Sequence, residues 1–199
     1  MSGKIVQRNL FSKGNKYLQL FPVLVIIGSR QCGKTVLSRQ LRPEWGYFDL
    51  EKSSDYDLIT SDYELFFREF PEQIIIDEAQ QDPTLFKELR GVIDSDRERK
   101  NRFILTGSSS PELLGNVAET LAGRAAVIEL GTLTLNERFE LPLSPFFSIF
   151  AGKISPGTLD RLKSLQLRHD HSVIMSHFLE GGYPEPALRD IDVRLWHGS

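Results

Sequence analysis

The sequence predicts an α/β fold built around a parallel β-sheet. A continuous apolar run at residues 22–27 is typical of a strand that is buried on both faces of a sheet. A glycine-containing segment at residues 28–35 follows this run directly, and a helical pattern of apolar residues follows the segment. Further strand-like runs then alternate with helical patterns, as expected for parallel strands joined by helical crossovers.

The remaining elements can be placed in chain order. The four strands expected after the first lie at 45–50, 73–77, 102–106 and 125–130. Helices are expected at 35–41, from Asp82-Pro83 to about residue 93, and at 113–121. Beyond the last strand the chain becomes irregular, with two short helical patterns near 162–167 and 173–179. We therefore expect one domain over residues 1–138 and a small helical appendage over residues 139–199.

Composition narrows the classes of protein that fit. The chain has 199 residues, a formal net charge of −3 and a single cysteine, Cys32, so an internal disulfide is excluded. Its apolar runs are too short for a transmembrane helix, and the first residues do not resemble a signal peptide. We expect a cytoplasmic protein without a membrane partner. The slightly acidic balance gives no support to nucleic-acid binding.

Residues 28–35, GSRQCGKT, match the phosphate-loop template G-x-x-x-x-G-K-[ST] at every fixed position. Backbone amides of such a loop point inward and hold phosphate oxygens, and the following helix adds its positive N-terminal end. Lys34 supplies a charge for the β- and γ-phosphates, and Thr35 offers a hydroxyl to Mg²⁺. The predicted nucleotide-binding residues are Gly28, Ser29, Arg30, Gln31, Cys32, Gly33, Lys34, Thr35 and Val36.

Cys32 stands at a variable position of this loop, which allows two interpretations. It is a small residue that fits the turn, or it is an accessible thiol whose alkylation blocks nucleotide entry. The second interpretation predicts that bound ATP protects Cys32 from a maleimide reagent.

Two adjacent carboxylates end the apolar strand at 73–77 and complete the pattern of an ATP hydrolase. A charge pair at the tip of a buried strand requires a cation or hydrogen bonds. Asp77 is the expected partner of Thr35 in holding Mg²⁺, and Glu78 is the expected general base that activates water. The chain contains no N-K-x-D motif for reading guanine, which favours ATP over GTP.

Hydroxyl and guanidinium groups later in the chain are further candidates. Thr106 and Ser108 lie at the end of the fourth strand, where they could contact the γ-phosphate or water, although a serine-rich helix cap is an alternative. Arg124 precedes the fifth strand and is either a charge-stabilising catalytic arginine or an ordinary ion-paired one. The alternating charges of residues 94–102 fit a solvated helix end or a small patch for anions or nucleic acid.

Taken together, these residues resemble the AAA+ superfamily, and in particular a prokaryotic group whose phosphate loop is G-x-R-Q-x-G-K-T. Further matches are IIIDEAQ at 74–80, LTGSSSPELL at 105–114, ETLAGRAAVIEL at 119–130, TLTLNE at 132–137 and GGYPEP at 181–186. The resemblance implies a three-layer P-loop NTPase fold with sheet order 5-1-4-3-2 and a site for ATP and Mg²⁺. It also implies that Arg124 is an arginine finger, often supplied to a neighbouring subunit of a homo-oligomer, and that residues 139–199 begin a C-terminal domain.

Three functions follow from these observations. The first is an ATP hydrolase that uses Lys34, Glu78, Arg124 and one hydroxyl from Thr106 or Ser108. The second is a nucleotide-gated module that binds a protein partner and hydrolyses slowly or not at all. The third is ATP-dependent work on nucleic acid, which only the basic residues of 97–102 support.

Overall fold

The computed structural model describes residues 5–146, 149, 154–165, 170–189, 191 and 196. These residues form two compact units. The first unit is Leu10–Gly131, and the second combines the residues before Leu10 with those from Thr132 onward. In this division residues 132–138 belong with the N-terminal segment, and the predicted domain boundary after residue 138 stays a prediction.

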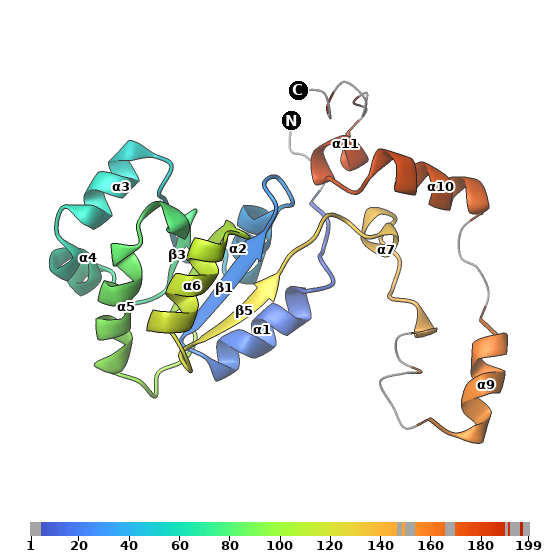
Figure 1. Cartoon of the computed structure of the whole chain (residues 1–199), viewed down its shortest axis with the longest axis horizontal. Coiled ribbons are helices and arrows are strands. Elements are labelled where there is room, and N and C mark those ends of the chain that lie inside the picture. The colour runs from blue at the N-terminus through green and yellow to red at the C-terminus, as the bar shows by residue number, and fades with distance from the viewer. Residues whose placement is uncertain are drawn as a thin grey trace. The chain divides into compact units, whose positions relative to one another are not determined.

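A five-stranded parallel sheet forms the centre of the first unit (Figure 1). Its strands are β1 (Val23–Gly28), β2 (Gly46–Asp49), β3 (Ile74–Asp77), β4 (Phe103–Ser108) and β5 (Ala125–Glu129). The spatial order is β2-β3-β4-β1-β5, which confirms the predicted order and places all five expected strands within about two residues of their predicted bounds.

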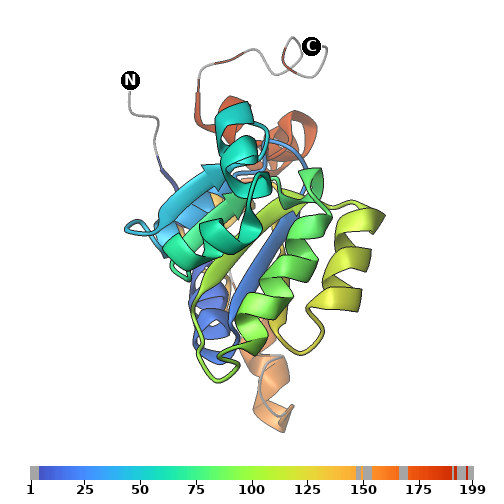
Figure 2. The ribbon, with the colours of Figure 1, turned by 90° about the vertical axis from the view of Figure 1, so that its left-hand side faces the viewer.

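Helices cover both faces of the sheet, as Figure 2 shows from one side. One face packs against α3 (Ser53–Thr60), α4 (Tyr63–Glu69), α5 (Thr84–Asp94) and α6 (Pro111–Thr120). The other packs against α1 (Phe11–Leu20) and α2 (Lys34–Leu41). Along β1, Val23 and Val25 belong to the first core and Leu24 and Ile26 to the second, which explains why this strand is apolar throughout.

Three helices of the first unit were not predicted. Helix α1 buries only Gly14 and Leu18, so its apolar periodicity is weak. Helices α3 and α4 lie between β2 and β3. They are short, and α4 buries only Phe66 and Phe67, so the sequence shows no clear helical period there. A short 3-10 helix, η1 (Ala79–Gln81), follows β3 directly.

The second unit contains α7 (Leu135–Arg138), α9 (Pro156–Lys163), α10 (His171–Glu180) and α11 (Pro184–Leu188). The expected helix near 173–179 is confirmed by α10. The helical pattern expected near 162–167 overlaps only the end of α9, which Ser155 caps, and its residues 166–167 lie outside the described residues. None of the helices that the structure describes combines the length and the apolar composition needed to cross a bilayer.

Buried polar contacts hold the second unit together. Arg8 Nε lies 3.2 Å from Glu137 Oε1, and both side chains are buried. Glu137 also accepts hydrogen bonds from the backbone amides of Asn9 at 2.6 Å and Thr134 at 2.9 Å. The amide of Leu133 donates to the carbonyl of Gly182 at 2.6 Å. The TLTLNE and GGYPEP segments therefore contact each other within this unit.

Candidate functional site

The loop between β1 and α2 has the backbone shape that its glycines predict. A side chain at Gly28 would place its Cβ 2.3 Å from the carbonyl oxygen of Leu130, so only glycine fits where β1 ends. Gly33 has a φ of 99°, and the non-glycine Gln31 has a φ of 61°. Helix α2 starts immediately afterwards, which directs its positive N-terminal end toward the loop.

Lys34 folds back over this loop. Its Nζ donates to the carbonyl oxygens of Gly28 at 3.3 Å and Ser29 at 3.1 Å, and the residue is buried. These contacts are hydrogen bonds to neutral carbonyls, which a phosphate oxygen can replace with stronger charge-assisted bonds. The lysine is therefore held where the template requires it, with its charge available to an anion.

Asp77, at the end of β3, is the centre of a buried hydrogen-bond network. Its Oδ2 accepts from the Thr35 hydroxyl and from the Tyr47 hydroxyl, each at 2.6 Å. Its Oδ1 accepts from the Thr106 hydroxyl and from the backbone amide of Glu78 at 3.2 Å. The predicted pair of Thr35 and Asp77 is thus brought into direct contact from segments 42 residues apart.

Tyr47 is a member of the site that the sequence analysis missed. It lies in edge strand β2 opposite Ile75, and its ring reaches diagonally to the carboxylate of Asp77. Burial and the hydrogen bond to Asp77 raise the pKa of Tyr47, so its hydroxyl is a proton donor at neutral pH. The guanidinium of Arg39 lies 3.9 Å from the centre of the Tyr47 ring. A tyrosine in a short, weak strand gives no indication of this role by pattern alone.

Glu78 adopts a left-handed backbone conformation, with a φ of 54°. Such a conformation costs a non-glycine residue about 1–3 kcal/mol and is common at functional sites. Glu78 Oε1 lies 3.9 Å from Lys34 Nζ, and Glu78 Oε2 accepts from Gln80 Nε2 at 2.5 Å. The carboxylate predicted to activate water is therefore directed at the same lysine that is predicted to hold phosphate.

The two hydroxyl candidates on β4 occupy different positions. Thr106 is fully buried and donates to Asp77, so it supports the carboxylate. Ser108 is the strand's last residue and pairs in register with Gly28, where the loop begins. The hydroxyl nearest the loop edge is therefore that of Ser108, and the alternative helix cap belongs to Ser110, which accepts from the amide of Leu113.

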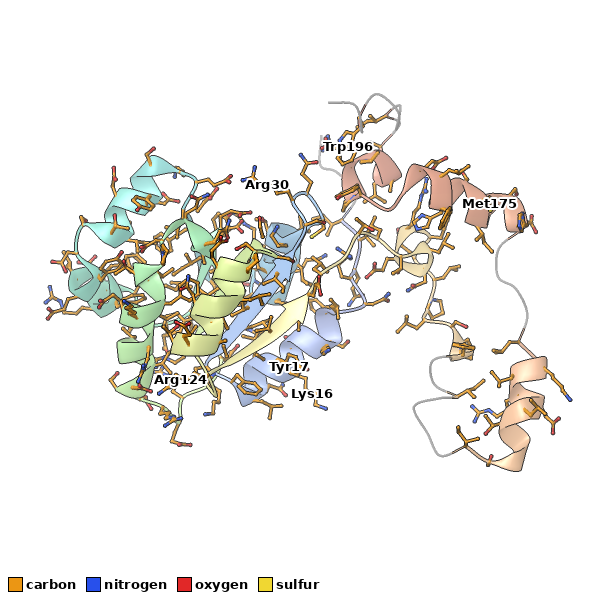
Figure 3. All side chains as sticks on the ribbon, viewed as in Figure 1. Lys16, Tyr17, Arg30, Arg124, Met175 and Trp196 are labelled. Atoms are coloured by element: carbon orange, nitrogen blue, oxygen red, sulfur yellow. The ribbon has the colours of Figure 1, made fainter. Side chains whose placement is uncertain are left out.

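Arg124 lies at the other end of the sheet from the loop. Its carbonyl oxygen accepts from the amide of Val23, the first residue of β1, whereas the loop follows the last residue. Figure 3 shows Arg30 of the loop and Arg124 at opposite ends of the strands. The Arg124 guanidinium holds Asp94 with bonds of 2.7 and 2.9 Å. A role for Arg124 in its own subunit's site does not fit, because the strand separates the two.

The remaining predicted nucleotide-binding residues differ in whether their side chains face solvent or the core. Arg30 pairs with Glu51 at 3.0 Å on the surface, and Val36 is exposed. Cys32 is fully buried in the core on the α2 face. The interpretation of Cys32 as an accessible thiol is therefore wrong for the folded protein, because its side chain is buried in the core.

The charged stretch at 94–102 does not form a continuous basic patch. Arg102 is buried and donates to the carbonyl oxygens of Val92 and Pro71, so it fixes the connection after α5. Arg99 pairs with Glu72. These contacts weaken the case for nucleic-acid binding at this segment.

The residues present fit a magnesium ion. Mg²⁺ prefers carboxylate and hydroxyl oxygens. Thr35 Oγ1 and Asp77 Oδ2 supply one of each, 2.6 Å apart, beside a loop and lysine suited to phosphates. Thr35 and Asp77 are therefore the residues that would hold Mg²⁺ at this site.

Comparison with known proteins shows a family match over the segment that contains the phosphate loop and Asp77. A family model described as AAA domain matches residues 20–139. Two curated proteins, the uncharacterized proteins Rv2008c of Mycobacterium tuberculosis and Mb2031c of Mycobacterium bovis, are each 38% identical over 136 residues. That match covers 67% of this chain but 30% of each relative, so the chain spans less than a third of their length.

Solved structures show a similar fold. The Walker-type ATPase PABY2304 of Pyrococcus abyssi aligns over 92% of this chain and 66% of its own, with a TM-score of 0.56 and 17% identity. The signal transduction ATPase PH0952 of Pyrococcus horikoshii, which carries a tetratricopeptide repeat sensor, aligns over 94% of this chain and 29% of its own, with a TM-score of 0.53 and 14% identity. At these identities the likeness concerns the fold alone.

Proposed function

The chain belongs to the AAA domain family, and from this premise we propose that it binds ATP together with Mg²⁺ and hydrolyses the bond between the β- and γ-phosphates. The observation that carries the proposal is the contact between Thr35 and Asp77, with Lys34 and Glu78 beside it at the same edge of the sheet. The phosphate loop comes from one segment, and the candidate metal carboxylate and the adjacent candidate base come from a second segment 42 residues further along the chain.

Each residue has a chemical task in this proposal. The loop amides and Lys34 hold the phosphates, and Lys34 exchanges its bonds to Gly28 and Ser29 for bonds to phosphate oxygens. Thr35 and Asp77 would hold Mg²⁺, which when bound neutralises charge on the phosphate oxygens. Ser108 would contact the γ-phosphate, and its register with Gly28 at the start of the loop supports this role.

Glu78 would act as the general base. It takes a proton from water while the water oxygen bonds to the γ-phosphorus and the bond to the bridging oxygen breaks, which releases ADP and phosphate. Phosphate in the loop gives Lys34 a second anionic partner, so the contact between Lys34 and Glu78 weakens and the carboxylate becomes available to water. Glu78 has a left-handed backbone conformation, and its carboxylate lies beside Lys34 at the edge of the loop.

Phosphate release and nucleotide binding together test the proposal. We expect Lys34→Ala to abolish ATP binding, and Glu78→Gln to retain binding but lose roughly 10²- to 10⁴-fold in turnover. An exposed glutamate on α5, changed in Glu88→Gln, serves as the matched control and should leave turnover unchanged. Wild-type turnover in Glu78→Gln would contradict the assignment of the base.

The position of Arg124 supports a role in a neighbouring subunit. A guanidinium placed on a transferring phosphoryl group contributes on the order of 10³-fold in rate. Arg124 cannot reach its own loop, so we propose a homo-oligomer in which it serves the next protomer. We expect a mixture of inactive Arg124→Ala and Glu78→Gln proteins to recover part of the activity, since mixed contacts can pair an intact base with an intact arginine. Mixtures no more active than either variant alone would contradict this role.

A nucleotide-gated module with little hydrolysis is the second candidate. The contacts of Glu78 with Lys34 and Gln80 favour it, because they engage both carboxylate oxygens of the candidate base. Tight ATP binding with wild-type turnover no faster than that of Glu78→Gln would select this function over hydrolysis.

A further inference from the structure

Four donors converge on Asp77, and one of them comes from the edge strand β2, which does not neighbour the phosphate-loop strand β1 in the sheet. Thr35 belongs to the loop, Thr106 to the neighbouring strand β4, and the Glu78 amide to the chain directly after Asp77. Tyr47 belongs to edge strand β2, and its contact with Asp77 spans 30 residues of sequence. The hydrogen bond from Tyr47 to Asp77 is therefore a tertiary contact that depends on how β2 and β3 are paired.

The geometry points to Tyr47 as a positioning residue that fixes the Asp77 carboxylate in the orientation required for Mg²⁺. This inference rests on the proposed function, because it concerns the same metal site. Tyr47 and Thr35 share the Oδ2 atom of Asp77, each at 2.6 Å, so the two hydroxyls define one direction for that oxygen. Thr106 and the Glu78 amide hold Oδ1, so rotation of the carboxylate breaks bonds at both oxygens.

The register of the sheet explains why a tyrosine reaches this position. Tyr47 pairs with Ile75, two residues before Asp77, and alternate residues of a strand lie on the same face. Asp77 is therefore the diagonal neighbour of Tyr47 on the same face, and the long tyrosine side chain contacts it. The ring packs against the core on the α2 face, so only the hydroxyl extends to the carboxylate. A shorter hydroxyl residue at this position would not reach.

Arg39 contacts the face of the Tyr47 ring. Its guanidinium stacks on the ring, 3.9 Å from the ring centre, an arrangement in which the cation is attracted to the π face. Arg39 lies on α2, the helix whose first turn carries Thr35. The helix therefore contributes one hydroxyl ligand directly and restrains the other hydroxyl through the stacked arginine.

Tyr47→Phe tests the inference because it removes the hydroxyl and keeps the ring. The affinity of a fluorescent ATP analogue is measured in EDTA and across a magnesium titration. We expect the magnesium concentration for half-maximal effect to rise about tenfold, as is typical when an outer partner of a metal ligand is lost. Affinity in EDTA should stay within about twofold of wild type, since the phosphate contacts are unchanged.

Tyr63→Phe is a matched control. The Tyr63 hydroxyl also donates to a carboxylate at 2.6 Å, but its partner is Asp82, which accepts from the amide of Thr84 at the start of α5. This variant loses the same kind of bond without touching Asp77 and should keep the wild-type magnesium dependence. Circular dichroism and thermal unfolding check that both variants are folded.

Each outcome decides between distinct claims. A rise in the magnesium requirement for Tyr47→Phe but not for Tyr63→Phe supports the positioning role. An unchanged requirement in both variants overturns it, and so does tighter magnesium binding in Tyr47→Phe, which would mean that the hydroxyl competes with the cation. A wild-type protein whose ATP affinity does not respond to magnesium would instead overturn the proposed function, and the Tyr47 inference with it.

Discussion

Two buried carboxylates, Asp77 in the first unit and Glu137 in the second, are satisfied in opposite ways. Asp77 accepts from three side-chain hydroxyls and one amide. Glu137 contacts the guanidinium of Arg8, accepts from the backbone amides of Asn9 and Thr134, and accepts from one hydroxyl, that of Thr134, at 3.1 Å. Each residue is only 4% exposed. Burial therefore does not distinguish them, and the nature of the donors does.

The donors determine what each carboxylate can do. A hydroxyl can rotate to donate or accept, whereas an amide N–H and a guanidinium only donate. The partners of Asp77 can therefore adapt when a cation binds, and the cation adds a full charge attraction. Glu137 already has a cation beside it, and apart from the Thr134 hydroxyl its donors are backbone amides and a guanidinium, which cannot accept. The first arrangement suits a ligand site and the second a structural contact.

The largest effect on stability is expected at Glu137. Glu137→Gln leaves Arg8 buried without its carboxylate and places an amide group against N–H donors, so the second unit should lose about 3–5 kcal/mol. Faster hydrogen exchange at the Asn9 and Thr134 amides, with a lower unfolding temperature, measures this loss. Glu88→Gln at an exposed position of α5 is the control and should change stability by less than about 0.5 kcal/mol. Equal exchange rates in the two variants would remove the distinction between the carboxylates.

The reverse pattern is expected at Asp77. In Asp77→Asn the neighbouring hydroxyls can rotate to accept from the new amide, so the unfolding free energy should change by about 1 kcal/mol or less. Magnesium dependence of ATP binding should weaken by roughly 10- to 100-fold, because the charge that attracts the cation is lost. A magnesium titration of nucleotide affinity beside denaturant unfolding measures both. A variant that unfolds as readily as Glu137→Gln would show that Asp77 is structural instead.

A smaller effect is expected from acid. Burial raises the pKa of Glu137, but the amides of Thr134 and Asn9 and the charge of Arg8 outweigh it and hold the pKa below its usual range. Its stabilising contribution is therefore complete above the unfolded value of about 4.3 and is lost as pH falls through the lower folded value. Unfolding free energies measured between about pH 7 and pH 3 should decline less steeply in Glu137→Gln than in wild type. An equal decline of the unfolding free energy with falling pH in the two proteins would contradict this linkage.

The phosphate loop and the sheet were predictable because they depend on local sequence. Buried parallel strands require continuous apolar runs, such as residues 22–27, and the loop requires glycine at Gly28 and Gly33. Helices α1, α3 and α4 were missed because each buries one or two side chains, too few for a clear period. The inward direction of Cys32 was also missed, since sequence position in a loop does not fix which way a side chain points.

The sequence by itself determined the α/β class, the order of the five strands along the chain, and the pairing of a phosphate loop with a carboxylate strand, because these depend on residue type and spacing. Only the tertiary structure decided that Tyr47 joins Thr35 at one oxygen of Asp77, that Arg124 lies at the opposite end of the sheet, and that Arg8 meets Glu137. The physical reason is that such contacts are set by strand register and by which sheet edge a residue reaches, and neither is encoded in a local pattern.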